Sequence, residues 1–599
     1  MKQLLIYNHT NNLDRIKHLL ILTLLALSNL CVSAQNSNSQ NKSQNLNTSM
    51  QETIFLHSNT TTFLTGETLY YKLFSLNPIN NTPSLISKIA YVELIDHDKN
   101  SLQKNKVYLE KGIGAGEYFI PTTLKTGSYK IIAYTKWMLN NPKSQTNEIE
   151  IFIINPFQTQ EPNDNITFDP TIKSTITGIK SESASNLTDE KRVDFELDKN
   201  SYYTREKANL KIKSITASIE KGNYSLSIRK IDQIPTLKQL SPQDFAKKTA
   251  ANYSNYETTF FNYVPELRSE LITGTIVSKS GLPINDKSVS LSLPGKEFVL
   301  KIVQTNNQGK FAFLLDKFPN FSDAIIQVID EKSSDYSIVF DPFPKFDTSS
   351  LQFTSKLNLT PDLKKDIEER STASQIQNAY YQIKKDSLVT EAVISPFFNT
   401  IEKTYVLDDY TRFPTLKENV VEVIVELYYR RENGKYKLRV RNDHKDLEMY
   451  GPPLVIVDGL LIQDPSDLFD YNMGNVDKVS LINEPYVYGP NLYGGMISFE
   501  TKNSDFASTY AKKYLKTMEI QRPNPEKIYN NPAYIAGNNL QRIPDYRYQL
   551  LWKPNLKLEE KEENVSFYTS DIKGDFEVVL EGFTEEGKPV YVTKTINVK

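Results

Sequence analysis

The stretch Pro452–Lys502, PPLVIVDGLLIQDPSDLFDYNMGNVDKVSLINEPYVYGPNLYGGMISFETK, contains three short apolar runs separated by turn residues. The runs 453–458, 476–482 and 495–501 are rich in β-branched side chains and are bounded by Gly, Pro, Asn and Asp. Short runs of this composition are typical of buried strands. Gly459 follows the first run and predicts a tight turn there. We therefore expect three strands in this stretch.

The order of these features resembles the plug domain of TonB-dependent outer-membrane receptors. The resemblance is carried by Val457, Asp458, Gly459, Val479, Tyr488, Gly489, Gly494, Gly495, Ile497, Thr501 and Lys502. It implies a small α+β domain over residues 404–503. In those receptors the plug is followed by a barrel, which needs on the order of a few hundred residues. Residues 503–599 lack the many alternating segments of such a barrel, so we expect a plug-like domain that does not work as a transporter.

Residues 1–34 have the composition of a secretory signal peptide. Arg15 and Lys17 precede the apolar core 19–27, and small residues end at Ala34, where we expect cleavage. The apolar core is too short to span a membrane. The sequence therefore predicts an exported protein.

Cys31 leaves a lipoprotein alternative open, although the large Leu30 before it disfavours lipidation. Residues 35–52 are rich in Asn, Ser and Gln, which predicts a disordered tether. No later stretch has the apolar length of a transmembrane helix. We expect a protein of the periplasm, the outer membrane or the cell surface that is soluble or peripheral to the membrane through a partner.

Short alternating segments with turn residues between them predict β-sandwiches. The first resembles the MG2 domain of alpha-2-macroglobulin-like proteins through Gly66–Thr68, Tyr91–Leu94 and Gly127–Thr135. A later one resembles the carboxypeptidase-regulatory-like domain through Leu271–Val277 and Thr305–Phe313. That resemblance implies a small β-sandwich without catalytic residues.

The expected fold class is mainly β, with tandem Ig-like or macroglobulin-like β-sandwiches, a small α+β plug-like domain and a short helical connector. The expected units are a signal peptide (1–34), a tether (35–52), an MG2-like sandwich (53–157), a second macroglobulin-like sandwich (165–265), a carboxypeptidase-regulatory-like sandwich (266–348), a helical connector (355–403), the plug-like domain (404–503), and an extended linker with a C-terminal sandwich (504–599).

With these pieces in this order, the chain resembles a family of exported envelope proteins of Bacteroidota. The runs Asp408–Thr415 before the plug-like stretch and Arg542–Arg547 after it belong to this resemblance. It implies location and architecture more than mechanism.

The composition argues against several kinds of chemistry. The net charge is -2, which gives no basic field for nucleic acid. After signal removal only His57, His97 and His444 remain and no Cys, so a zinc site is not expected. No nucleophile elbow, P-loop or dinucleotide fingerprint occurs. We therefore expect no catalytic residues, no cofactor and no metal.

Tyr486, Tyr488 and Tyr493 flank glycines in the plug-like stretch, and tyrosine is favoured at protein interfaces. These tyrosines and Asp458 are the candidate partner-contact residues. The alternative interpretation is that they are core and turn residues of the plug-like domain.

These observations favour a non-enzymatic envelope scaffold whose plug-like domain docks to an outer-membrane protein, such as a barrel or a secretion or transport component. The sequence leaves open a second class, a cell-surface protein that binds glycan or peptide. A peptidase accessory is the least favoured interpretation. The oligomeric state is not indicated.

Overall fold

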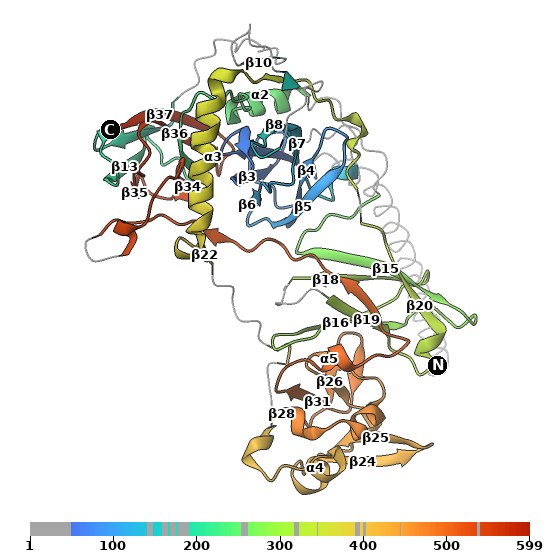
Figure 1. Ribbon diagram of the computed structural model, residues 1–599. Coiled ribbons are helices and arrows are strands. Elements are labelled where there is room, and N and C mark those ends of the chain that lie inside the picture. Colours follow the sequence, from blue (N-terminus) through green and yellow to red (C-terminus); the bar gives the residue numbers. More distant parts are fainter. Residues whose placement is uncertain are drawn as a thin grey trace, which may run out of the picture.

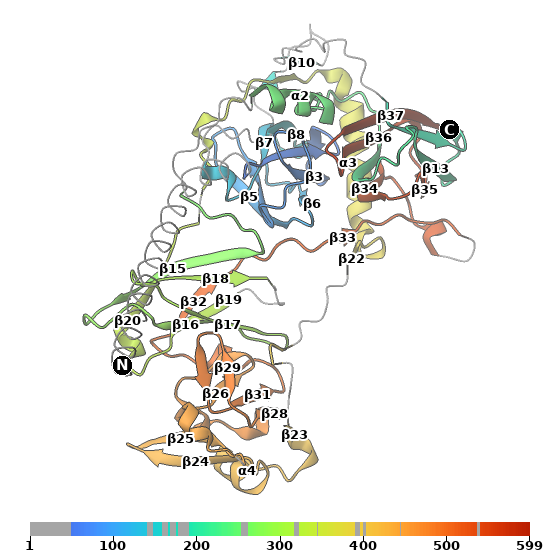
Figure 2. The same ribbon diagram turned by 180° about the vertical axis from the view of Figure 1, so that it is seen from behind.

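The computed structural model describes residues 50–140, 148–158, 166–167, 175–177, 191–252, 262–316, 323–343, 345–389, 396–398, 403–443, 445–535 and 539–599. The predicted signal peptide and the tether before residue 50 lie outside this part of the chain. Two β-sandwiches lie side by side at one end of the molecule, a third lies below them, and an α+β unit forms the other end (Figures 1 and 2). Among the described residues, no helix combines the length and apolarity needed to cross a membrane.

The first sandwich is formed by residues 53–154. Its strands alternate, so that Leu69, Tyr71 and Leu73 of one strand enter the core while Lys72 and Phe74 face outward. Its two sheets have the strand orders β1 (Thr53–Ser58), β3 (Thr68–Leu76), β6 (Ile113–Phe119), and β2 (Thr62–Leu64), β8 (Glu148–Ile154), β7 (Gly127–Tyr134), β4 (Ile89–Ile95), β5 (Ser101–Tyr108).

The second sandwich combines two segments that lie far apart in the chain. Strands from residues 193–230 pair with strands from residues 549–598 in both sheets. The sheets have the orders β11 (Val193–Leu197), β13 (Lys207–Ser214), β35 (Glu562–Tyr568), and β12 (Ser201–Tyr202), β37 (Pro589–Val598), β36 (Gly574–Thr584), β14 (Gly222–Lys230), β34 (Gln549–Leu558).

The expectation of two separate sandwiches, at 165–265 and at the C-terminus, is therefore wrong. Strand β14 lies between β34 and β36 and forms hydrogen bonds with both. Leu226, Leu556 and Leu580 belong to one continuous core. Each half has apolar strands of the right length, which is why each suggested its own domain, but neither half has enough strands to close both sheets.

The third sandwich is formed by residues 270–340 and gains an edge strand from residues 516–519. Its sheets have the orders β18 (Lys310–Leu315), β15 (Glu270–Ser278), β20 (Tyr336–Phe340), and β17 (Val299–Gln304), β16 (Ser288–Leu293), β19 (Asp323–Val328), β32 (Lys516–Glu519). The predicted linker after residue 504 thus completes this sandwich. The mainly β class with tandem sandwiches is confirmed.

The α+β unit contains the three predicted strands of the 452–502 stretch in one sheet. The sheet order is β23 (Lys403–Val406), β28 (Val476–Ile482), β31 (Met496–Thr501), β26 (Leu454–Val457), β27 (Leu460–Leu461). Helix α4 (Leu416–Glu422) begins with a capping box in which Thr415 and Glu418 bond reciprocally. A separate hairpin of β24 (Leu427–Glu432) and β25 (Lys435–Val440) packs on the same core.

The predicted helical connector at 355–403 is helical only in part. It contains α3 (Lys364–Ala379), two short 3-10 turns, Pro361–Leu363 and Tyr381–Ile383, and short strands β21 (Lys356–Asn358) and β22 (Ser387–Leu388). Strand β21 pairs with β9 (Ile166–Thr167) and β10 (Ile176–Thr177), and β22 pairs with β33 (Lys527–Ile528). The loosely spaced apolar residues of this region therefore serve several short elements.

Helix α3 runs between the two upper sandwiches (Figure 1). Its Arg370 is 2% exposed and forms ion pairs with Glu67 at 2.7 Å and with Asp232 at 3.0 Å. Glu67 belongs to the first sandwich, and Asp232 follows strand β14 of the second. Arg370 also donates to the Thr62 carbonyl oxygen at 2.8 Å. One buried guanidinium thus joins both sandwiches to the helix.

We expect a fragment that ends at residue 348 to leave the second sandwich unfolded, because β13 and β14 lose the strands that pair with them. Hydrogen exchange should show unprotected amides in β11, β13 and β14, while strands of the first sandwich stay protected. Adding the separate peptide 545–599 should restore protection. Full protection of β14 in the shorter fragment alone would contradict the shared-sandwich arrangement.

Replacing Arg370 by Met should destabilise the chain by about 3–5 kcal/mol, because Glu67 and Asp232 stay buried without their cation. Urea unfolding measures this change. The variant Lys365→Met, on the exposed side of the same helix, is the matched control and should change stability by less than about 0.5 kcal/mol.

The ion pair between Arg370 and Glu67 also predicts how stability depends on pH. Burial by itself would raise the pKa of Glu67, but the charges of Arg370 and Arg229 lower it below the usual value of 4.5. A carboxyl with a lowered folded-state pKa stabilises the protein above the unfolded pKa, and this stabilisation is lost as the pH falls through the folded pKa. The stability of the wild type should therefore fall as the pH drops below 4.5, and Arg370→Met should make this fall smaller. An unchanged acid limb would contradict this assignment.

Candidate binding groove

The predicted contact tyrosines lie in an interface between the α+β unit and the third sandwich. Tyr486 and Tyr488 end β29 (Tyr486–Tyr488), and Tyr493 ends β30 (Asn491–Tyr493). The Tyr488 hydroxyl donates to the Leu300 carbonyl oxygen, and its ring lies 4.2 Å from that of Phe397. Tyr493 is 9% exposed. The packing supports the alternative interpretation, in which these tyrosines are core and turn residues. The prediction that Tyr493 contacts a partner is wrong.

Asp458 is 1% exposed and is also wrongly predicted as a partner contact. Its carboxylate accepts from the Thr501 amide at 2.7 Å, the Thr501 hydroxyl at 2.6 Å and the Phe506 amide at 3.3 Å. Burial raises the pKa of Asp458, while these bonds act in the opposite direction. The residue therefore fixes the end of β31 and the start of α5 (Phe506–Thr509) instead of meeting solvent.

Two glycines of the 452–502 stretch let the α+β unit approach the third sandwich. A Cβ at Gly459 would overlap the Phe298 side chain, and a Cβ at Gly489 would lie 2.6 Å from the Ile302 carbonyl oxygen. Both glycines have positive φ, +83° and +59°. Leu300, Ile456 and Met496 then form a shared apolar core. The glycine pattern is thus used for docking between two units of the same chain.

The variant Gly489→Ala should loosen this interface, because the added methyl group meets main-chain oxygen and the backbone conformation becomes strained. Small-angle scattering should show a larger maximum dimension, and proteolysis should become faster between the two units. Gly434→Ala is the matched control: it also has positive φ, but a Cβ there meets open space. A compact Gly489→Ala protein would contradict the tight contact.

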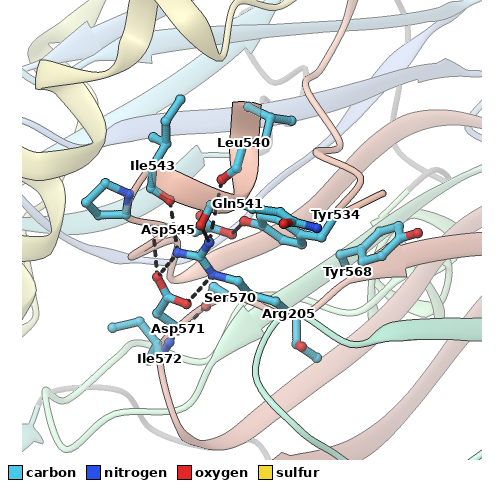
Figure 3. A network of polar contacts seen from close by, with 12 residues as sticks. Arg205, Tyr534, Leu540, Gln541, Ile543, Asp545, Tyr568, Ser570, Asp571 and Ile572 are labelled. Carbon is cyan, nitrogen blue, oxygen red and sulfur yellow. Dashed lines mark hydrogen bonds and ion pairs between the residues drawn. The ribbon is translucent and has the colours of Figure 1, made fainter. Parts of the chain in front are cut away.

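The run Arg542–Arg547, which the sequence singled out, is held by Arg205 of the second sandwich (Figure 3). The Arg205 guanidinium pairs with Asp571 through two bonds of 2.6 Å and donates to the carbonyl oxygens of Gln541 at 2.7 Å and Ile543 at 2.9 Å. Asp545 is fully buried and pairs with Arg547 at 2.8 Å. This network fixes the chain where it enters β34.

A Ser, His and Glu lie in the order of a catalytic triad between the first two sandwiches. Ser225 Oγ lies 2.9 Å from His57 Nε2, and His57 Nδ1 lies 2.8 Å from Glu581 Oε1. Sequence reasoning missed this set because its members are far apart in the chain. Ser225 and His57 are each 1% exposed, and Ser225 lies opposite Glu581 inside the sheet. A substrate could reach Ser225 only if the sandwiches separated, so the set acts as a polar interface contact.

A half-enclosed cavity of about 1070 Å³ lies where the first two sandwiches and the segment 522–529 meet. One wall is the outward face of β6, with the half-exposed Ile113, Ala115 and Glu117 and the exposed Phe119. Strand β6 is at the edge of its sheet. We call this cavity the β6 groove.

The second wall of the β6 groove comes from the second sandwich, with Asn223, Pro554 and Phe583. The segment 522–529 forms its rim. The main-chain N–H of Asn524 donates to the Lys106 carbonyl oxygen at 2.7 Å, and the side-chain amide of Asn555 donates to the Glu526 carboxylate at 2.6 Å. The rim therefore contacts both sandwiches.

The lining of the β6 groove combines exposed rings with charged and amide groups. Tyr108 is 45% exposed and Phe119 52% exposed, so both present ring surface to the groove. Glu117 pairs with Lys527 across the groove. A concave site with apolar rings and a few polar groups is the usual form of a ligand pocket.

No protein-family model and no curated protein matches the sequence. Among solved structures, the chain is weakly matched to alpha-2-macroglobulin of Escherichia coli activated by porcine elastase, at 10% identity and a TM-score of 0.23, covering 92% of this chain and 44% of that one. An alpha-2-macroglobulin mutant of Salmonella matches at 9% identity and a TM-score of 0.23, covering 92% of this chain and 40% of that one. The adhesin InvE of Yersinia pseudotuberculosis matches at 9% identity and a TM-score of 0.13, covering 48% of this chain and 57% of that one. This chain spans less than half the length of these macroglobulins.

Proposed function

We propose that this chain is a non-enzymatic interaction scaffold of the bacterial cell envelope, and that its β6 groove takes an extended segment of a partner protein. The observation that carries the proposal is the groove itself, a cavity of about 1070 Å³ beside an edge strand. The export signal at residues 1–34 and the resemblances to carboxypeptidase-regulatory-like and plug-like modules of exported Bacteroidota proteins support the envelope location.

An extended peptide suits the groove for two reasons. Strand β6 is an edge strand, and an edge strand can bond an added chain through its outer main-chain groups. Ile113 already exchanges main-chain bonds with Glu110, and the Glu117 carbonyl oxygen accepts from Asn105, so an added segment would bond around Ala115. The side chains of Ile113, Ala115 and Glu117 alternate with Gly114 and Gly116 along β6. Every second side chain of a bound segment would therefore face the groove, and the side chains between them would face away from it.

A second contact is the plug-like unit, for which we propose docking to an outer-membrane protein. The observation that favours it is position: the third sandwich covers one side of this unit, and the opposite side forms the end of the molecule (Figures 1 and 2). Removing residues 404–502 should then abolish association with that protein in detergent-solubilised envelopes, while the β6 groove keeps its own ligand.

Photo-crosslinking in cells tests the groove. A benzophenone amino acid at Phe119 should crosslink one defined envelope protein through a short segment, identified by mass spectrometry. The matched control is the same probe at Ile215, which is 51% exposed on the second sandwich but does not line the groove. Filling the groove with Ala115→Arg should abolish a crosslink from a probe at Tyr108.

Equal crosslinking from positions 119 and 215, or a crosslink that survives Ala115→Arg, would contradict peptide binding in the groove. If no protein is captured at position 119 but purified chain binds envelope glycans in an Ala115-dependent manner, the peptide proposal is wrong and glycan capture replaces it.

A further inference from the structure

The β24–β25 hairpin has two chemically different faces. Its turn is Asn433-Gly434, and both residues have positive φ, as a two-residue hairpin turn requires. One face enters the core of the α+β unit with Leu427, Leu438 and Val440, each at most 3% exposed. The cross-strand register fixes which side chains share the other face, which we call the outer face.

The outer face carries a stripe of cations. The register places Tyr428 opposite Arg439, Arg430 opposite Lys437, and Glu432 opposite Lys435. Arg441 continues the same alternation one step beyond β25. Five cations, Arg430, Lys435, Lys437, Arg439 and Arg441, thus share this face with two carboxylates, Glu432 and Glu426. Glu426 lies opposite Arg441 and is neutralised by Lys403.

Two of the five cations are neutralised within the unit. Arg430 pairs with Glu448 at 3.0 Å and Lys435 pairs with Asp464 at 2.5 Å. Within the described part of the chain, Lys437, Arg439 and Arg441 form no ion pair. The outer face therefore keeps a local positive charge, although the whole chain has a net charge of -2.

Exposed apolar side chains lie beside this stripe. Met449 is 74% exposed and follows Glu448, which also accepts from the Tyr428 hydroxyl at 2.5 Å. Val425 is 54% exposed, and its carbonyl oxygen accepts from Arg441 at 3.1 Å. Cations bordered by exposed apolar side chains are typical of surfaces that bind anionic membranes.

We propose that the outer face of the β24–β25 hairpin docks on an anionic lipid bilayer. Lys437, Arg439 and Arg441 meet lipid phosphates, and Met449 and Val425 enter the boundary between headgroups and acyl chains. A soluble polyanion would use the cations but would leave these apolar side chains in water. The hairpin projects at the end of the molecule farthest from the upper sandwiches (Figure 1), so docking there leaves the β6 groove open to a partner.

Co-sedimentation of the full mature chain with vesicles tests this proposal. Vesicles of phosphatidylglycerol and phosphatidylethanolamine should bind the chain, vesicles of phosphatidylcholine alone should not, and binding should weaken as salt rises. The triple variant Lys437→Gln, Arg439→Gln, Arg441→Gln should lower the partition coefficient by about tenfold or more. The matched control is Lys356→Gln, Lys364→Gln, Lys365→Gln, which removes the same charge from exposed sites near and on α3 and should bind as the wild type does.

A second measurement separates lipid docking from simple attraction to phosphate. The variant Met449→Trp places a fluorophore beside the cations without changing the charge. Its emission should shift to the blue with anionic vesicles and stay unchanged with inorganic polyphosphate. Equal loss of binding in both triple variants, equal binding to neutral vesicles, or no shift on anionic vesicles would overturn the proposal. Binding to polyphosphate but not to vesicles would overturn it in favour of a soluble polyanion.

Discussion

The pairing of β14 with β34 on one side and β36 on the other is the constraint on which the rest of this structure depends. It joins residues 222–230 to residues 549–584, so everything between them is an insertion into the second sandwich. The entropic cost of closing such a loop grows slowly with its length. A large insertion is therefore tolerated, provided that the two halves of the sandwich share a core such as that of Leu226, Leu556 and Leu580.

The insertion is held against the sandwiches by a few buried ion pairs. Arg370 reaches from α3 to Glu67 and Asp232, and Lys384 lies 3.6 Å from the buried Asp545. Removing one partner of such a pair leaves a buried charge, whereas the intact pair specifies one arrangement. The contact of Ser225, His57 and Glu581 has the same role between the sandwiches, with Lys72 beside it. Buried Lys72 donates to Asn223 at 2.5 Å, and burial holds its pKa well below the usual range.

The β6 groove follows from this arrangement. Each sandwich by itself has a closed apolar core, but the outward face of β6 extends beyond the contact between them, and the segment 522–529 passes over the gap. A cavity forms because rigid sandwiches of fixed curvature meet at an edge and cannot fill the space between them. The two surfaces that carry our proposals are the groove and the outer face of the β24–β25 hairpin. They lie at opposite parts of the molecule.

The sequence by itself determined the mainly β class, the three strands of the 452–502 stretch and the tight turn at Gly459, because strand period and turn chemistry are properties of neighbouring residues. It did not determine that β14 pairs with β34 and β36, since short apolar strands fit many partners and the choice is made by packing between distant segments. For the same reason it predicted Asp458 and Tyr493 as contacts, although the fold buries both. Only the tertiary structure brought His57 to Ser225 and aligned Lys437, Arg439 and Arg441 on one face, because both arrangements depend on register and domain contact.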